Sequence, residues 1–283
     1  MRSPPVGIRP PDATSGPAPA HRSSGTFSAV RTLARINVTP VKGTGLLHPD
    51  RVELTAIGIP GNRRYWLIDD RGMLFSGSSH GPLVAVRADA DGDRLRVRFP
   101  DGSEIEGDGT AAGDPVVTDF YGRNVPGHVV GGSFSSAWTG YVGAPVRLVR
   151  GDRDGDGPDE MPLTVVSYAS VETLASGGGH AGDLNPLRFR INLELAGCEP
   201  YEEDSWDGRR VRVGGAVVRI QGQVPRCVVT TQDPTTGLKD WNTLKQIAVQ
   251  RPQIPGGGLP FGVYAVVETP GTIAVGDTVD PLD

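Results

Sequence analysis

The sequence predicts a mainly β protein of the α+β class, folded as two lobes. Its 283 residues include 40 glycines and 25 prolines, which are costly inside helices and favour short strands joined by tight turns. Pairs of apolar runs flank polar turns along much of the chain. A segment rich in Gly, Asp and Pro at 151–160 marks a boundary between two parts, and the chain is long enough for two modest domains.

The first residues differ in composition from the rest of the chain. Residues 1–28 are rich in Pro and Arg and lack a continuous apolar run. We therefore expect a disordered leader there rather than a secretory signal. Apolar residues begin to alternate within Ala34–Pro40, which is typical of a strand. The predicted folded domains are 29–150 and 151–283, with the linker near 151–160.

Three hairpins are predicted from turn residues that lie between strand-like runs. The turn residues are Gly, Asp, Ser and Pro, which favour the backbone angles that reverse a chain. The predicted turns and flanking runs are 69–72 between Tyr65–Ile68 and Met73–Phe75, 100–103 between Leu95–Phe99 and Ile105, and 214–215 between Val211–Val213 and Val217–Ile220.

Two helices and a shorter third one are predicted from caps and apolar spacing. Ser167–Ala175 starts with a serine that can cap a helix. A second helix runs from Asp240 until Pro252 stops it, and its apolar side chains recur at helical spacing. The third covers Ser136–Val142 and ends at Gly143.

Charge and cysteine content limit the possible partners and compartment. The formal net charge of −5 offers no general attraction to nucleic acid or anionic lipid, so we expect no nucleic-acid partner. The apolar runs are too short to span a bilayer, so no membrane association is expected. Two cysteines cannot form a disulfide framework, which favours a reducing compartment, and we predict the cytoplasm.

Several familiar site motifs are absent or incomplete. The segment from Asp152 starts like a calcium loop, but Leu163 stands where a bidentate glutamate is required. The five histidines form no pair at metal-ligand spacing, so a zinc enzyme is disfavoured. No dinucleotide-binding, phosphate-loop or hydrolase-elbow motif is present.

Cys227 is the residue with the clearest chemical potential. It follows Arg226, whose charge favours the thiolate, the form that ligates metals or attacks electrophiles. A packed core cysteine is the structural alternative, since free cysteines are among the most buried residues. The same core role is our expectation for Cys198.

Ordered motifs along the chain resemble a known family. Three of them resemble the MOSC domain of molybdenum-cofactor sulfurases, of the mitochondrial amidoxime-reducing component and of its bacterial relatives: Leu187–Asn192, Gly197–Trp206 and Arg226–Gly237. Two C-terminal segments, 261–264 and 270–277, are similar to the same domain. Upstream segments resemble the MOSC N-terminal β-barrel domain: 39–43, 64–66 and 143–148.

The resemblance implies two β-barrel-like lobes that hold a molybdenum cofactor (molybdopterin) in a basic cleft between them. Cys227 would be the catalytic residue and the molybdenum ligand, with a soft thiolate suited to that metal. The other residues implied to bind the cofactor are Lys42, Arg64, Arg190, Asn192, Arg226 and Thr230. Lys42, Arg64 and Arg190 would hold the phosphate of the pterin.

The reductase branch of the family implies the chemistry. It would be reduction of an N-hydroxylated or N-oxygenated small molecule by a molybdenum-dependent oxidoreductase. Two cysteines cannot bind an iron–sulfur cluster, so electrons would come from a separate electron-transfer protein of ferredoxin or cytochrome type.

This chain departs from the family pattern at three places. Pro225 stands where reductase-type members usually carry a polar residue, and Ile191 replaces a common proline. Residues 75–83 lack a basic residue that many relatives have. Two alternatives to the reductase therefore stay open. One is a cofactor carrier or sulfur-transfer protein with a persulfide on Cys227, and the other is a binding module without metal.

Overall fold

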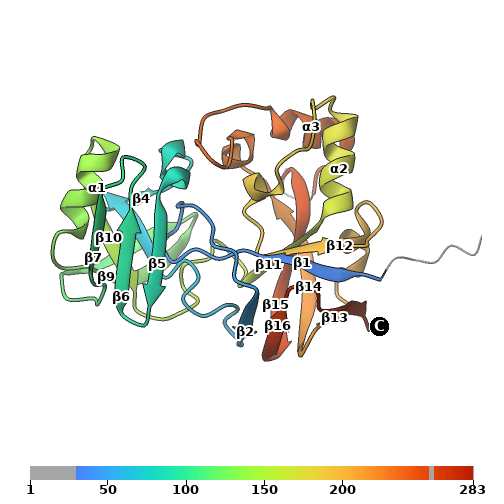
Figure 1. The fold of residues 1–283 in the computed structure, drawn as a ribbon, viewed down its shortest axis with the longest axis horizontal. Coiled ribbons are helices and arrows are strands. Elements are labelled where there is room, and N and C mark those ends of the chain that lie inside the picture. The colour runs from blue at the N-terminus through green and yellow to red at the C-terminus, as the bar shows by residue number, and fades with distance from the viewer. Residues whose placement is uncertain (1–29, 255–257, 283) are drawn as a thin grey trace, which may run out of the picture.

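The computed structural model describes residues 30–254 and 258–282. Strands predominate over helices in these residues, and they form two lobes that lie side by side (Figure 1). One main sheet closes almost into a barrel, and the other curls into half a barrel. The predicted α+β fold with two barrel-like lobes is confirmed. The leader predicted at 1–28 lies outside the described residues.

The first lobe consists of two antiparallel sheets and a helix. Its five-stranded sheet has the order β4-β3-β10-β9-β8, and its three-stranded sheet has the order β5-β6-β7. Helix α1 packs against β10. The bounds are β3 Tyr65–Asp69, β4 Leu74–Phe75, β5 Arg87–Asp91, β6 Arg94–Arg98, β7 Glu104–Asp108, β8 Pro115–Phe120, β9 Arg123–Val129, β10 Val146–Gly151, α1 Phe134–Val142 and the 3₁₀ helix η1 Gly81–Ala85.

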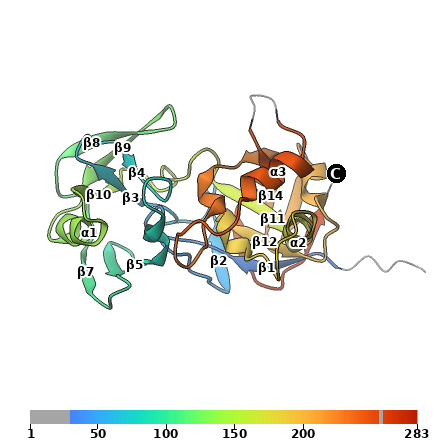
Figure 2. The same ribbon diagram turned by 90° about the horizontal axis from the view of Figure 1, so that it is seen from above.

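The second lobe is a seven-stranded sheet of order β1-β12-β11-β15-β14-β13-β17 with two neighbouring helices, α2 and α3 (Figure 2). Strands β11 and β12 are parallel, as their connection through α2 requires. The bounds are β1 Thr32–Ile36, β11 Leu163–Ser167, β12 Leu193–Ala196, β13 Arg210–Val213, β14 Ala216–Pro225, β15 Pro260–Thr269, β17 Val279–Pro281, α2 Tyr168–Gly177, α3 Thr243–Gln250 and the 3₁₀ helices η2 Pro186–Phe189, η3 Glu202–Trp206 and η4 Val228–Thr231.

Two N-terminal strands join the second lobe, although they precede the first lobe in the chain. Strand β1 pairs antiparallel with β12, and β2 (Arg51–Leu54) pairs with β16 (Gly271–Ala274). A single cut at 151–160 therefore does not separate the sheets, because β1 and β2 lie before it. The boundaries 29–150 and 151–283 stay a prediction about the domains of the chain.

The predicted hairpins and helices are present with small shifts at their ends. Strand pairs β3–β4, β6–β7 and β13–β14 are antiparallel neighbours, as the turn residues predict. Helix α2 follows Ser167, whose Oγ accepts a hydrogen bond from the N–H of Ser170 at 3.1 Å. Helix α1 starts two residues earlier than predicted and ends at Gly143, which has φ 73°. Helix α3 starts later, at Thr243, because Asn242 is its cap.

Cys198 packs against the apolar core of the second lobe, as expected. Burial raises the pKa of this thiol to about 12, so it is protonated at neutral pH. Cys227, by contrast, is exposed, and the alternative of a buried core cysteine does not apply to it. None of the helices in the described part of the chain is long and apolar enough to cross a membrane.

Candidate functional site

A cavity of about 880 Å³ lies where the two lobes meet, with walls from both. The first lobe contributes residues of the loops after β1 and β4 and of the β8–β9 hairpin. The second lobe contributes the η2 segment and the end of β14 with the turn after it. Its basic, sulfur-bearing and acidic lining residues are Lys42, Arg63, Arg123, Arg188, Arg190, Arg226, Met161, Cys227, Asp159, Glu160 and Asp233.

Cys227 reaches this cavity because β14 ends irregularly just before it. The register of β14 against β15 shifts between Gln223 and Pro225, and Pro225 cannot donate a ladder hydrogen bond. The chain then turns into η4. Both the N–H and the Oγ1 of Thr230 donate to the carbonyl of Cys227, at 3.2 and 3.0 Å. The turn thus fixes the backbone of Cys227 and leaves its thiol exposed.

Arg226 points inward from the same turn and binds two backbone carbonyls. Its Nε donates to Phe261 at 2.7 Å, and its Nη1 donates to Phe189 at 3.0 Å. Its Nη2 is buried with no hydrogen-bond partner among the described residues. Burial lowers the pKa of Arg226, but a guanidinium stays charged at neutral pH. Arg226 therefore brings a buried positive charge to the cavity wall, on the residue that precedes Cys227.

Arg190 and Arg63 form a second basic pair on the cavity wall. Arg190 ends η2 in the left-handed region, with φ 53°, and its Nη2 donates to the carbonyl of Thr44 at 2.7 Å. Nη2 of Arg63 donates to the backbone carbonyl of Arg190 at 3.0 Å. Burial lowers the pKa of both arginines, and the charge of Arg63 lowers the pKa of Arg190 further. The pair joins the two lobes through backbone contacts.

Lys42 is the most buried of the basic groups from the first lobe. Its Nζ donates to the carbonyl of Gly157 at 2.8 Å and lies 2.6 Å from a carboxylate oxygen of Asp159. The ammonium also lies over the ring of Phe120, 4.6 Å from its centroid. Burial lowers the pKa of Lys42 to about 8, although Asp159 opposes this effect. Lys42 is thus charged at neutral pH and close to losing that charge.

Lys42 lines the cavity, and so do four more of the residues predicted to bind the cofactor: Arg190, Arg226, Thr230 and Cys227. Two do not. Arg64 forms an ion pair with Asp154 at 3.0 Å, outside the cavity lining. Asn192 is buried behind the wall, where its side chain donates to the carbonyl of Asn37 at 3.1 Å. Arg64 therefore does not line the cavity in this structure, and the roles predicted for Arg64 and Asn192 in cofactor binding stay predictions.

Arg63 lines the cavity, although the sequence singled out its neighbour Arg64. The backbone of Arg63 adopts φ 57°, so the chain kinks just before β3. The pair of adjacent arginines was the available signal, but the sequence does not show which of them follows the kink.

Acidic groups were missed because they come from the segment expected to be a linker. Asp159 and Glu160 line the cavity. Desolvation raises the pKa of Asp159, but the charges of Lys42 and Arg63 outweigh it and leave the pKa below its ordinary value. The segment is held against the first lobe, since Arg123 donates to backbone carbonyls of both Asp156 and Pro158. The described residues contain no group of three or more His, Cys, Asp or Glu side chains that could hold a metal ion.

Two family descriptions match the chain in the order that the fold shows. The MOSC N-terminal beta barrel domain matches residues 30–143, and the MOSC domain matches residues 152–280. Among solved structures, the YuaD protein from Bacillus subtilis has 12% sequence identity and a TM-score of 0.42, over 88% of this chain and 94% of that one.

Curated relatives cover most of the chain. Mitochondrial amidoxime-reducing component 1 from Homo sapiens is 28% identical over 289 residues, which is 88% of this chain and 82% of that protein. Mitochondrial amidoxime reducing component 2 from Bos taurus is 26% identical over 282 residues, with 88% and 83% covered. The two domain matches and these relatives lead to one identification. The chain belongs to the MOSC family and carries a MOSC N-terminal β-barrel domain followed by a MOSC domain.

Proposed function

We propose that the protein binds a molybdenum cofactor in the cavity between its lobes and reduces N-oxygenated small molecules. The observation that carries the proposal is the position of the Cys227 thiol. It is exposed on the wall of a cavity that gathers basic side chains in a chain of net charge −5. A cavity of about 880 Å³ lies within the usual range of roughly 300–1,000 Å³ for sites of small molecules and cofactors.

The residues present fit such a cofactor. A thiolate is a soft ligand suited to molybdenum, and guanidinium and ammonium groups suit a dianionic phosphate. Nη2 of Arg226 is buried without a hydrogen-bond partner among the described residues, so Arg226 has a donor that a bound polar group would satisfy. Lys42 and Asp159 partly neutralise each other, which offsets some of the repulsion among the basic groups of the wall.

When bound, the cofactor would supply the removal of an oxygen atom and the two-electron exchange that follows. The residues of this chain would bind the cofactor and orient it. Cys227 would ligate the metal, and Arg63, Arg190 and Lys42 would hold the phosphate. The lobes would enclose the reacting centre and exclude bulk water from it. Asn192 would support this wall from behind, through its hydrogen bond to the backbone of Asn37.

Electrons would reach the site from a separate protein. Cys198 is packed against the core and Cys227 lies in the cavity, so the two cannot ligate an iron–sulfur cluster together. We therefore infer a ferredoxin- or cytochrome-type donor. The relatives are named as amidoxime-reducing components of mitochondria, which supports amidoximes as the first substrates to test. The cytoplasm stays our prediction for the location of this chain.

The test is the molybdenum and pterin content of the purified full chain from a host that makes the cofactor. We expect near-stoichiometric metal in the wild type and its loss in Cys227→Ala. Cys198→Ala is the matched control, because it removes the other thiol and should keep the metal. An amidoxime assay with an artificial reductant then follows the loaded protein, without need of the natural donor.

The same experiment separates the alternatives. Wild-type protein without metal or pterin contradicts the reductase. Sulfane sulfur bound to Cys227 would then support the sulfur-transfer protein, and its absence would support the binding module. Bound pterin with no turnover of any N-oxygenated compound would support a cofactor carrier.

A further inference from the structure

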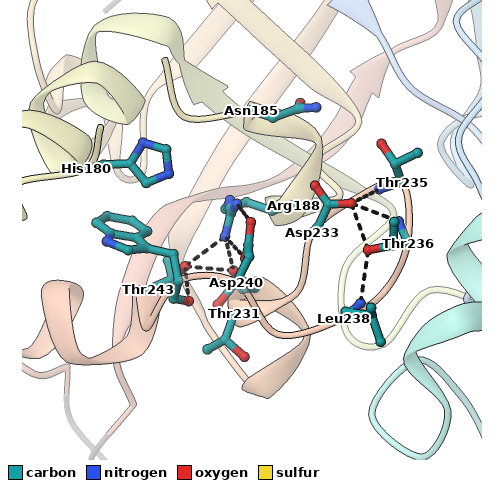
Figure 3. Close-up of polar contacts among 12 residues, drawn as sticks. His180, Asn185, Arg188, Thr231, Asp233, Thr235, Thr236, Leu238, Asp240 and Thr243 are labelled. Atoms are coloured by element: carbon teal, nitrogen blue, oxygen red, sulfur yellow. Dashed lines mark hydrogen bonds and ion pairs between the residues drawn. The ribbon is translucent and has the colours of Figure 1, made fainter. Parts of the chain in front are cut away.

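Arg188 is a buried charge that belongs to the Leu187–Asn192 motif and lines the cavity, but it has no role in the proposed cofactor site. Its side chain is only 3% exposed. It lies in η2, two residues before Arg190, and forms a two-bond ion pair with Asp240. Nη2 donates to Oδ2 at 2.8 Å, and Nη1 donates to Oδ1 at 3.2 Å (Figure 3). Asp240 comes from the loop before α3, so the pair joins two distant parts of the chain.

The same guanidinium reaches the turn that carries Cys227. Nη1 of Arg188 donates to the carbonyl of Thr230 at 3.2 Å, and Oγ1 of Thr243 donates to the same carbonyl at 2.7 Å. Thr230 in turn binds the carbonyl of Cys227 with both its N–H and its Oγ1. A continuous set of hydrogen bonds therefore runs from the Arg188–Asp240 pair to the backbone of Cys227.

Stability alone is a poor explanation for this arrangement. Only the arginine is buried, because the Asp240 side chain is 36% exposed. Burying a guanidinium costs desolvation that its attraction to a carboxylate often fails to repay, and a well-packed apolar residue is frequently as stabilising. Nε of Arg188 has no hydrogen-bond partner among the described residues, which adds to the cost. A buried charge of this kind is better explained by what it holds in one arrangement, and here it holds the carbonyl of Thr230.

A second arginine reinforces the link from the opposite side. Nη1 of Arg226, the residue before Cys227, donates to the carbonyl of Phe189, the residue after Arg188. The η2 segment and the Cys227 turn are thus bound to each other at two points. Because Arg190 directly follows Phe189, these bonds also fix Cys227 relative to a basic group of the cavity wall.

We propose that Arg188 is a positioning residue that, with Asp240 and Thr243, holds the Cys227 turn in the conformation that presents the thiol to the cavity. The inference deepens the proposed function, since it concerns the residue expected to ligate the metal. It concerns the protein before any cofactor binds, and it is tested there.

The first experiment measures amide hydrogen exchange in the purified, cofactor-free full chain. In Arg188→Gln we expect peptides covering 226–232 to exchange at least about tenfold faster than in the wild type, since local opening controls their exchange. Arg251→Gln is the matched control. Arg251 is also a buried arginine, 9% exposed, paired with Asp204, with Nε unpartnered, but it does not line the cavity.

A general loss of stability would affect both variants alike. The proposal therefore requires faster exchange at 226–232 in Arg188→Gln and not in Arg251→Gln. If both variants speed exchange there equally, or if neither does, the proposal is wrong. Should Arg188→Gln fail to fold, Thr243→Val supplies the same measurement, because it removes the other donor to the carbonyl of Thr230.

The second readout is the rate at which a small alkylating reagent modifies Cys227, measured on its own peptide so that Cys198 does not contribute. We expect a change of about threefold or more and a broader spread of rates in Arg188→Gln, with partial recovery in Arg188→Lys, whose single ammonium cannot match both Asp240 and Thr230. A rate equal to that of the wild type in Arg188→Gln contradicts the proposal.

Neither readout uses molybdenum, so this inference and the proposed function can fail separately. If the protein binds no metal but shows the selective effect of Arg188→Gln, the reductase proposal is wrong and the proposal that Arg188 is a positioning residue is supported. If the protein binds metal but amide exchange at 226–232 is equal in the two variants, the reductase proposal is supported and the positioning proposal is wrong.

Discussion

Arg188 and Arg226 cross-link the same two segments in opposite directions. Arg188 donates from the η2 segment to the carbonyl of Thr230 at 3.2 Å, and Arg226 donates from the Cys227 turn to the carbonyl of Phe189 at 3.0 Å. Arg226 thus satisfies the carbonyl of the residue after Arg188, and Arg188 satisfies a carbonyl in the turn that follows Arg226. The wall of the cavity that carries Cys227 is held by side chains that are themselves buried or half-buried, rather than by regular sheet pairing.

Arg226→Lys should destabilise the protein by about 1–3 kcal/mol, because one ammonium cannot reach both the Phe261 and Phe189 carbonyls and leaves a buried acceptor unpaired. Denaturant unfolding of the cofactor-free protein measures this change. Arg98→Lys is a suitable control, since Arg98 is an exposed member of an ion pair with Glu104 and should change stability by less than about 0.5 kcal/mol. Equal effects of the two substitutions would contradict the prediction.

Lys42 should make anion binding by the cavity depend on pH. Burial lowers the pKa of Lys42 to about 8, so this side chain loses its charge as the pH rises above that value. The affinity of the wild type for a phosphate monoester, fully dianionic in this range, should fall by up to about tenfold per pH unit above pH 8. Calorimetric titration at several pH values measures the slope. Lys42→Arg stays charged and should give a nearly flat profile, and parallel profiles would refute the assignment.

The same lowered pKa predicts how stability depends on pH. Between about pH 8 and the ordinary value of 10.5, unfolded Lys42 binds a proton that the folded side chain has lost. The free energy of unfolding therefore rises with pH over this window, and its slope is proportional to the number of protons that the unfolded state binds in excess. The difference between the wild type and Lys42→Met in unfolding free energy should change with pH in this window and be constant below about pH 7. A constant difference throughout would contradict a lowered pKa.

Glu203→Gln should leave the second lobe as stable as the wild type or more stable at pH 7. Oε1 of Glu203 accepts from the N–H of Ser167 and the Oγ of Ser170, while Oε2 is buried with no hydrogen-bond partner in the part of the chain that the structure describes. Desolvation raises the pKa of Glu203, so the stability it contributes is greatest at low pH and is lost as the pH rises through that value. A glutamine keeps both bonds without the charge. Thermal unfolding at pH 4 and pH 7 tests this, and a larger loss at pH 7 than at pH 4 would overturn it.

Gly81→Ala should disturb the contact between the lobes. A Cβ at Gly81 would lie 2.1 Å from the carbonyl oxygen of Gly237, so one lobe must move away from the other. We expect a loss of stability of about 2 kcal/mol or more, as for other forced overpacking. Gly140→Ala in helix α1 is the control, because a Cβ there meets nothing within 4 Å and alanine favours helix. If Gly81→Ala leaves the free energy of unfolding unchanged, the contact between Gly81 and Gly237 is not tight.

The sequence by itself determined the local elements and the family. Turn residues placed the hairpins around 69–72 and 214–215, since Gly and Asp act on the backbone of their own neighbours. Ser167 predicted the start of α2 because a cap needs only the next few residues. Ordered motifs identified the MOSC family, and with it Cys227, which does line the cavity.

Only the tertiary structure decided which charges face the cavity. Arg63 rather than Arg64 lines it because of a positive φ that no local pattern required. Asp159 enters from the predicted linker because Lys42, 117 positions earlier in the chain, lies 2.6 Å from it. Arg188 meets Asp240 and Thr230 across more than 40 residues. Such contacts depend on how two lobes and three separate segments pack together, and sequence neighbours carry no information about that packing.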